Sequence, residues 1–465
     1  MDRRKFIATG TLAGLGAAAT GTSRAADTGK GTTESPAIMG RRTPSDTVRL
    51  GFIGTGLRGR GHLGLALRRD DVAVTAVCDI DPAALQAAEK MVADAGWAAP
   101  AAYGDGDYAF MDLLARDDVD AVVISTPWLW HTRMAVAAMK AGKYAGVEVS
   151  AANTLEECWD LVNVHEETGV PVMILENVNY RRDVMAVLNM VRKGLFGELI
   201  HCECGYQHDL RHVKFNDGRQ AYGGGVEFGE KGFSEARWRT AHSVHRNADI
   251  YPTHGLGPVA MYLDINRGNR FVSLTSTATK ARGLHDYIVN HPAGGENHPN
   301  AKVEFKLGDV ITTVIRTQNG ESIIVSHDTN LPRPYSLGFR VQGTKGIWMD
   351  VNRSIYLEGM EPAHAWHDAA PLLAEHDHPL WKHYEERATG AGHGGMDFFV
   401  LHAFVEACKA QVQTPLDAYD AAAWSAVTPL SEMSIAAGNA PQAFPDFTRG
   451  LWMKRRQDFA TGDAY

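Results

Sequence analysis

The chain has 465 residues, of which 45% are apolar and 22% charged, and its formal net charge at pH 7 is −9. This balance is typical of a globular protein of about two or three domains, and the acidic charge excludes the basic footprint of a nucleic-acid-binding protein. The cysteines are spaced for neither a zinc site nor a disulfide framework, so we expect no metal ion and interpret them as packing residues: Cys78, Cys158, Cys202, Cys204 and Cys408.

Residues 1–25 have the pattern of an export signal. Arg3 and Arg4 begin a basic region, a mild apolar run rich in Ala and Gly follows, and Ser23-Arg24-Ala25 offers small residues for cleavage. Paired arginines in this position indicate a twin-arginine signal peptide; the alternative is a disordered basic tail. We therefore expect the twin-arginine export machinery to deliver the protein to the periplasm or the medium. No segment reaches the roughly 18 apolar residues that span a bilayer, so no stable membrane anchor is expected.

Residues 26–47 are polar and rich in Gly, Thr, Ser and Pro, which predicts a linker. Short strands that are apolar throughout then alternate with helices over residues 48–178. This alternation predicts an α/β domain of the Rossmann type, a doubly wound parallel sheet covered by helices on both faces. The strands are expected at 48–54, 72–80, 120–127, 144–149 and 170–177, and the helices up to residue 69 and at 82–96, 132–142 and 155–169.

The pattern changes in residues 179–465. Segments 197–209, 302–329 and 339–359 alternate apolar and polar residues, and Asn319-Gly320 marks a hairpin turn. We expect an α+β domain built on an antiparallel sheet, followed by C-terminal helices at 396–411 and 418–438. Residues 211–247 are rich in Gly and charged residues without periodicity, which predicts a long functional loop rather than core.

A glycine-rich turn follows the first expected strand. In this GxGxxG motif Gly54 allows a tight turn, Gly56 lets the backbone approach a pyrophosphate, and Gly59 permits close packing of the helix. Asp79 ends the second strand, where its carboxylate can accept both ribose hydroxyls and repel a 2′-phosphate. The motif, the strands and the acid together predict a dinucleotide site that prefers NAD over NADP.

Two further strands of the same sheet end on candidate site residues. Trp128, Trp130 and His131 follow the strand at 120–127, and Glu148 closes the strand at 144–149. Ligands of such sheets bind beyond the carboxyl ends of the strands, so we expect the loop to line the nicotinamide half of the crevice. The alternative is that the two tryptophans are core residues.

The order of these motifs resembles the Gfo/Idh/MocA oxidoreductases. In that family Lys-Pro follows the strand-ending glutamate and the lysine takes part in proton transfer, whereas here Val149 and Ser150 follow Glu148. Four segments, 177–185, 204–215, 238–271 and 333–348, look closely like glycoside hydrolase family 109, NAD-dependent glycosidases typified by α-N-acetylgalactosaminidase. The resemblance extends from about Val48 to near the C-terminus.

This resemblance implies glycoside cleavage without net redox. Bound NAD⁺ takes hydride from C3 of the sugar, the resulting ketone acidifies the C2 hydrogen, and loss of that proton expels the aglycone from C1. Water then adds and the hydride returns, so no carboxylate pair flanking the bond is needed. The expected partner is a glycan or glycoside that ends in α-N-acetylgalactosamine or a related N-acetylhexosamine.

Two other functions compete with this one. The first is an exported NAD(P)-dependent sugar oxidoreductase of the Gfo/Idh/MocA family, and the missing lysine favours the glycosidase over it. The second is a non-catalytic sugar-binding module. The polar residues at 206, 239, 251 and 254 form a complete catalytic set, which argues against such a module. A homodimer is also expected, because antiparallel sheets of such second domains often pair with a neighbour.

The resemblance also implies site residues. The NAD contacts would be Leu57, Arg58, Asp79, Trp128, Leu129, Trp130, His131, Glu148, Val149 and Asn177, and the sugar contacts Tyr206, Arg239, the segment Tyr251–His254 and Tyr335. We assign His254 as the base for the C3 hydroxyl, because histidine accepts a proton near pH 7; the alternative is a capped loop residue. Tyr206 is the predicted partner at C2, with Tyr251 as competitor. A phenol titrates near 10, so it would need a positive neighbour such as Arg239 or NAD⁺. Glu176 is a further candidate to face the sugar.

Overall fold

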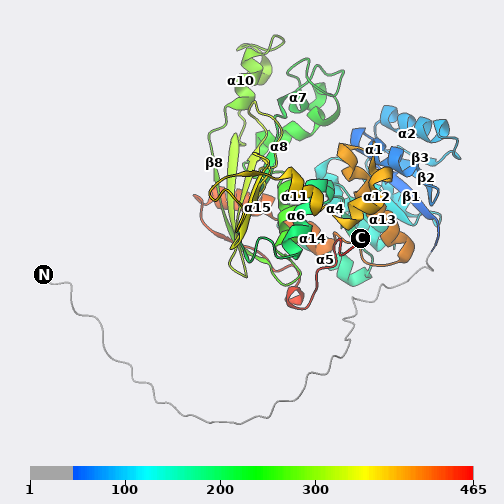
Figure 1. Cartoon of the computed structure of the whole chain (residues 1–465). Coiled ribbons are helices and arrows are strands. Elements are labelled where there is room, and N and C mark those ends of the chain that lie inside the picture. Colours follow the sequence, from blue (N-terminus) through cyan, green and yellow to red (C-terminus); the bar gives the residue numbers. More distant parts are fainter. Residues whose placement is uncertain (1–44, 464) are drawn as a thin grey trace, which may run out of the picture. The chain divides into compact units, whose positions relative to one another are not determined.

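The computed structural model describes residues 45–463 and 465 (Figure 1). The predicted signal peptide at 1–25, and the predicted linker up to residue 44, lie outside the described residues. Within the described part of the chain, no helix is both long enough and apolar enough to cross a membrane.

The first sheet is entirely parallel and confirms the predicted doubly wound domain. Its strands are short and apolar and, apart from the edge strand β3, mostly buried, as expected when helices cover both faces. The strand order is β3-β2-β1-β4-β5-β6, so it reverses between β1 and β4, where such sheets bind their ligands. The bounds are β1 (Val48–Ile53), β2 (Val72–Cys78), β3 (Ala101–Tyr103), β4 (Ala121–Ile124), β5 (Tyr144–Val147) and β6 (Val172–Ile174).

The predicted helices of this domain begin at clear sequence signals. The Asp81 carboxylate accepts the backbone N–H of Ala83 at the start of α2, and Thr154 forms a capping box with Glu157 at the start of α5. The short elements β3 and α3 are absent from the prediction, because three to five residues carry too little periodicity to be recognised. The helices are α1 (Leu57–Ala66), α2 (Pro82–Asp94), α3 (Phe110–Leu114), α4 (His131–Lys140) and α5 (Leu155–Thr168).

The second sheet is antiparallel except where β10 lies parallel to β7. The exception arises because the hairpin at Asn319-Gly320, where Gly320 has φ +108, fixes the direction of β10 against β9. The order is β14-β13-β12-β11-β7-β10-β9-β8-β15. The homodimer expected through this sheet stays a prediction. The bounds are β7 (Leu199–Gln207), β8 (Phe271–Ala278), β9 (Val310–Thr317), β10 (Ser322–Asp328), β11 (Arg340–Gly343), β12 (Gly346–Met349), β13 (Ser354–Leu357), β14 (His367–Asp368) and β15 (Gln442–Ala443).

The C-terminal segment returns to the first sheet. α13 (Met396–Ala410) packs against α1 and β1, and α14 (Ala418–Ser425) packs against α5 and β6 (Figure 1). The helical pattern predicted at 418–438 is confirmed as two helices, because α14 ends at Ser425 and α15 (Val427–Ala436) follows. Pro429 lies in the first turn of α15, where a missing N–H is tolerated. The other helices are α6 (Arg182–Arg192), α7 (Arg211–Lys214), α8 (Arg239–His245), α9 (Thr253–Tyr262), α10 (Gly283–Asn290), α11 (Ala370–Glu375) and α12 (Pro379–Ala388).

Residues 211–247 are not the coreless loop that the sequence predicts. They contain α7 and α8, and Phe215 and Val226 are fully enclosed in a small hydrophobic cluster with Leu284 and Ile288 of α10. Each short piece contributes only one or two apolar side chains, so the cluster leaves no periodic trace in the sequence.

The five cysteines are all buried and unpaired, which confirms their interpretation as packing residues. Among the described residues, no group of three or more His, Cys, Asp and Glu side chains is placed to hold a metal ion.

Candidate active site

The site begins at the turn between β1 and α1, where two glycines are required by contact. Gly54 has φ +85, and a Cβ on it would lie 2.7 Å from the carbonyl carbon of Ser125 after β4. A Cβ on Gly59 would lie 1.9 Å from the carbonyl oxygen of Gly54. The turn therefore packs directly against the end of β4, and the N-terminus of α1 opens into the crevice between β1 and β4.

One end of the crevice is a small apolar cavity beside Asp79. Gly54, Asp79, Pro127 and Trp130 line it. Asp79 Oδ2 accepts the backbone N–H of Thr55 at 2.6 Å, and Asp79 Oδ1 accepts that of Asp81 at 2.9 Å. Asp79 Oδ2 also accepts the Thr55 hydroxyl at 3.2 Å. Each carboxylate oxygen has two acceptor positions, so Asp79 keeps capacity for a ribose hydroxyl at Oδ1. This cavity fits the adenosine half of a dinucleotide.

The other end is a cavity of about 490 Å³ between the two domains. Thr126 lines this cavity and the one beside Asp79, so the two cavities adjoin at the end of β4. Together they form the elongated, two-part space that an extended dinucleotide requires. The cavity brings together most of the predicted contacts: Leu57, Arg58, Trp128, His131, Glu148, Val149, Asn177, Tyr206, Arg239, Tyr251, His254 and Tyr335.

Glu148 lies just past β5 and is held as an anion. Arg58 Nε donates to Glu148 Oε1 at 2.5 Å, and His62 Nε2 donates to the same oxygen at 2.7 Å. Burial opposes ionisation of this carboxyl, but Arg58 and His62 outweigh it and lower the pKa of Glu148 to about 2. A carboxylate with so low a pKa orients its neighbours and does not exchange protons near neutral pH.

A second buried carboxylate, Asp397 in the first turn of α13, ties the crevice to the C-terminal segment. Asp397 Oδ2 accepts from Arg58 Nη1 at 2.8 Å and from His393 Nδ1 at 2.7 Å, and its Oδ1 accepts from Asn177 Nδ2 at 2.8 Å. Burial acts against the charge, but His393 and Arg58 outweigh it and hold the pKa of Asp397 below its usual range.

His393 is the most exposed ionisable group of the cavity, with 62% of its side chain accessible. Its hydrogen bond to Asp397 raises its pKa above the usual histidine value. It has φ +51, an uncommon conformation for a residue other than glycine, within a run of glycines from 390 to 395. The sequence prediction missed both His393 and Asp397. The signal available was a histidine among glycines directly before a helix, the same kind of setting that singles out His254.

The part of the cavity predicted to hold the sugar is organised around His254. Its Nδ1 donates to Glu176 Oε1 at 2.6 Å, and that oxygen also accepts the backbone N–H of Val178 at 3.0 Å. Glu176 is completely buried, so it acts through His254 and does not face the sugar as the sequence suggested. The bond occupies Nδ1 and leaves Nε2 as the ring nitrogen available to a ligand.

Two tyrosines stand beside His254. The Tyr206 ring lies 4.7 Å from that of Tyr251 and 5.4 Å from the His254 ring. Burial raises the pKa of Tyr206, and Arg239 only partly offsets it; the pKa of Tyr251 is likewise well above its usual value. The predicted positive neighbour is therefore present, but desolvation outweighs it, and both phenols are hydrogen-bond donors near neutral pH.

Arg239 is itself paired with Glu235, which lines the cavity and was missed in the sequence. Its guanidinium stands 4.9 Å over the Trp128 ring and 5.1 Å over the Tyr251 ring. Trp128 is 4% exposed and stacks on Tyr251 at 5.3 Å, so it is both a buried residue and a wall of the site.

Three residues of the predicted loop lie differently from one another. Trp130 lines the cavity beside Asp79 instead of the larger one, and Leu129 is exposed and lines neither. His131 is buried, and its ring nitrogens lie 2.7 and 2.8 Å from the carbonyl oxygens of Thr126 and Ser150. A neutral imidazole donates only one such bond, and burial lowers the pKa of His131. His131 thus joins the loops after β4 and β5 as well as lining the cavity.

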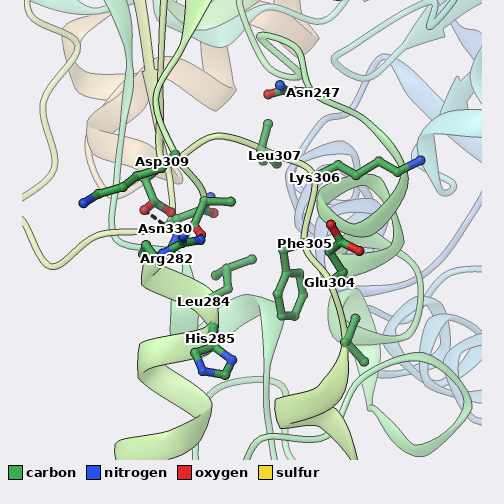
Figure 2. Close-up of a pocket in the computed structure, with 13 residues that line it drawn as sticks. Asn247, Arg282, Leu284, His285, Glu304, Phe305, Lys306, Leu307, Asp309 and Asn330 are labelled. Carbon is green, nitrogen blue, oxygen red and sulfur yellow. Dashed lines mark hydrogen bonds between the residues drawn. The ribbon is translucent and has the colours of Figure 1, made fainter.

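Another cavity, of about 640 Å³, shares no residue with this site. Figure 2 shows it between Asp309 and Arg282 on one side and Phe305 and Lys306 on the other. The Asp309 carboxylate accepts the backbone N–H groups of Arg282 and Gly283 and so holds the start of α10. This acid therefore supports the backbone, and none of the predicted site residues lines this cavity.

Comparison with known proteins agrees with this geometry. The family model of the glycosyl hydrolase 109 C-terminal domain matches residues 180–454, and that of the oxidoreductase family's NAD-binding Rossmann fold matches residues 48–176. A glycosyl hydrolase family 109 protein of Stenotrophomonas maltophilia is 57% identical over 90% of this chain and 93% of its own length. An alpha-N-acetylgalactosaminidase of Tannerella forsythia is 52% identical over 98% of this chain and 99% of its own length.

Solved structures share the fold at much lower identity. A levoglucosan dehydrogenase in complex with NADH and L-sorbose has a TM-score of 0.62 and 19% identity, covering 86% of this chain and 100% of its own. A scyllo-inositol dehydrogenase of Lactobacillus casei, with bound NAD(H) and scyllo-inositol, has a TM-score of 0.58 and 13% identity, covering 86% and 99%. These likenesses establish the two-domain arrangement, and the match to the NAD-binding Rossmann fold makes NAD the cofactor.

The cavity beside Asp79 predicts how the cofactor is selected. Replacing Asp79→Ser removes the ribose acceptor and the charge that repels a 2′-phosphate. A hydrogen bond to a charged group is worth about 1.5–3 kcal/mol, so we expect the preference for NAD over NADP to fall about tenfold or more. Fluorescence titration of the apoprotein with NADH and NADPH measures the ratio. The control is Asp107→Ser, because Asp107 lines the same cavity. An unchanged ratio in the Asp79→Ser protein would contradict the assignment.

Proposed function

The chain belongs to glycosyl hydrolase family 109, and we propose that it is an α-N-acetylgalactosaminidase that keeps NAD bound through each turnover. One observation carries this proposal. The proton-handling side chains His254, Tyr206 and His393 line a single cavity with the nicotinamide-side residues, while Glu148 is followed by the buried Val149 and not by a base.

The residues of the sugar side have distinct tasks in this proposal. When bound, NAD supplies a hydride acceptor for C3 of the sugar. The C3 ketone makes the C2 hydrogen acidic until the hydride returns later in the same turnover. His254, held at Nδ1 by Glu176, accepts the proton of the C3 hydroxyl through Nε2. Arg239, which packs against the rings of both Trp128 and Tyr251, orients the sugar from a fixed position.

The base at C2 is the Tyr206 phenol, acting with its neighbour His208. A phenol with a raised pKa removes a carbon-bound proton only after giving up its own. The Tyr206 hydroxyl donates a hydrogen bond to His208 Nδ1 at 3.2 Å, which orients the phenol, and the Arg239 guanidinium favours the phenolate that forms. Tyr251 makes no such contact with a histidine nitrogen among the described residues, and this difference favours Tyr206 at C2.

His393 supplies the proton that the departing glycosidic oxygen needs. It is the exposed imidazole of the cavity, and its bond to Asp397 raises its pKa and so favours the protonated form. The flanking glycines give its backbone the freedom to approach a bound glycoside and to withdraw when product leaves.

The reaction itself is tested by two signals measured together. We expect release of p-nitrophenol from the α-N-acetylgalactosaminide without stoichiometric growth of NADH absorbance, because the hydride returns in every turnover. Turnover in heavy water should place deuterium at C2 of the product, and a 3-deoxy substrate should be inert. The matching α-N-acetylglucosaminide serves as the comparison for sugar preference. Steady NADH accumulation on a free sugar, with no aglycone released, would instead show the oxidoreductase.

The role of His393 predicts a specific dependence on leaving group and pH. His393→Ala should lower kcat/KM by about 10²–10⁴-fold for an alkyl glycoside, the usual effect of losing a general acid, and far less for the nitrophenyl glycoside. A general acid acts only while it is protonated. Wild-type activity should therefore fall as pH rises through the raised pKa of His393, and the variant should lose this alkaline decline. His285→Ala, at an exposed histidine outside the site, is the control. Equal losses on both glycosides with an unchanged alkaline limb would assign His393 a structural role.

We also propose that the protein is exported by the twin-arginine route. The support is in the sequence: the paired arginines, the mild apolar run and the small residues before position 26. Replacing Arg3→Lys and Arg4→Lys together should retain the protein in the cytoplasm, whereas Arg24→Lys should not. Cell fractionation with detection of the full-length and processed chains measures the outcome. Export that persists in cells lacking the twin-arginine translocase would refute the proposal.

A further inference from the structure

A further cavity adjoins the active site across a single side chain. It has a volume of about 860 Å³, and Tyr335 lines both it and the active-site cavity. The Tyr335 side chain is therefore the wall between them. Tyr335 is 49% exposed, so about half of its surface is open to solvent and to a ligand. A half-exposed aromatic ring between two polar cavities offers a face on which a sugar ring can pack.

The segment that carries Tyr335 is held rigidly. Pro332 and Pro334 restrict its backbone, and Ser336 exchanges two hydrogen bonds with Gln207 at the end of β7, at 3.1 and 2.9 Å. The Tyr335 ring lies 6.2 Å from the Tyr206 ring and 5.0 Å from the His208 ring. The wall is thus in direct contact with the residues that handle the C2 proton.

The lining of this further cavity suits a neutral, hydroxyl-rich ligand. Arg181 is paired with Asp183 at 2.6 Å and with Asp350 at 3.2 Å, and Arg333 is paired with Asp328 at 2.9 Å. These charges compensate one another, so the cavity attracts neither a strong anion nor a strong cation. Arg353 is exposed and makes no ion pair within the described residues. Guanidinium, carboxylate, amide and hydroxyl groups around an aromatic ring are the polar contacts that sugar hydroxyls require.

The active-site cavity is too small for a long glycan. Its volume of about 490 Å³ lies in the lower part of the range, about 300–1,000 Å³, that holds one small ligand. It must accept the nicotinamide end of NAD and the terminal sugar together. Any sugar on the far side of the cleaved bond must therefore lie outside it.

We propose that the cavity beyond Tyr335 binds the aglycone, as one or two neutral sugars that follow the residue being cleaved. This inference rests on the proposed glycosidase function and specifies where the rest of its substrate lies. The competing exit passes Tyr222, which is 53% exposed and lines the active-site cavity alone.

The experiment compares a short and a long substrate in variants that alter only this cavity. Ala370→Trp fills the cavity from the exposed start of α11, and Arg353→Asn shortens a polar side chain at a position with φ +53, which asparagine tolerates. The matched control is Ala374→Trp, one turn later on α11 at an exposed position outside the cavity. Tyr222→Ala tests the competing exit. The substrates are the nitrophenyl α-N-acetylgalactosaminide and a neutral trisaccharide that ends in the same sugar.

We expect Ala370→Trp to lower kcat/KM for the trisaccharide about tenfold, which corresponds to the loss of one or two hydrogen bonds. The nitrophenyl substrate should change by less than about twofold on the same scale, and Ala374→Trp should behave as wild type. Arg353→Asn should also lower kcat/KM for the trisaccharide, by raising KM. Saturation-transfer NMR with the disaccharide that lacks the terminal sugar should show contact in the wild type and none in Ala370→Trp.

The other outcomes overturn the inference or its premise separately. Equal effects of Ala370→Trp on both substrates, or no effect on either, would refute the aglycone site. The aglycone site would also be refuted if only Tyr222→Ala lowered kcat/KM selectively for the trisaccharide. It would likewise be refuted if Ala370→Trp lowered kcat/KM only for a glycopeptide substrate. If the wild type cleaves no N-acetylgalactosaminide but the disaccharide still contacts the cavity, the proposed function fails and the sugar-binding cavity stands. Absence of both cleavage and contact refutes both.

Discussion

The site depends on one buried carboxylate, that of Asp397. It binds Arg58 of the glycine-rich turn, Asn177 after β6 and His393 of the C-terminal glycine run, and is itself 6% exposed. Burying a charge is costly, and removing one partner of a buried pair typically destabilises a protein by about 3–5 kcal/mol. Here Arg58 also neutralises Glu148, so Arg58 links the two buried carboxylates Glu148 and Asp397 and each of them depends on it for a partner. This constraint requires α13 to close on the first domain and thereby places His393 in the cavity.

The network divides the cavity into two electrostatic sides. On the cofactor side Glu148 and Asp397 have lowered pKa values, because arginine and histidine partners outweigh their desolvation. On the sugar side Tyr206 and Tyr251 have raised pKa values, because burial outweighs the influence of Arg239. In the proposed complex, the fixed anions Glu148 and Asp397 therefore lie on the side of NAD. The neutral rings of Tyr206 and Tyr251 and the His254–Glu176 pair lie on the side of the sugar. In the proposed reaction, the residues that exchange protons come from the second domain and from the glycine-rich segment 390–395.

This division explains why a strand-ending glutamate without a following base is functional. Glu148 keeps its place at the end of β5 because it bonds Arg58 and His62, and Val149 beside it is 3% exposed. A base at position 149 would stand next to a carboxylate that is already committed to two partners. The proton transfers proposed for His254, Tyr206 and His393 need no such residue.

The sequence by itself determined the local features of this protein. The apolar strands, the capped helices, the glycine turn and Asp79 follow from short-range periodicity and backbone sterics, and they specify a Rossmann domain with its ligand crevice. The sugar-side residues were recognised only by resemblance, because a tyrosine or histidine in isolation is as often a buried structural residue. Tertiary structure alone decided that Glu176 supports His254, that residues 211–247 build a small core, and that Asp397 meets Arg58 from 339 positions away. Such contacts depend on how separate elements pack, and no periodicity within one segment records which distant carboxylate will neutralise its arginine.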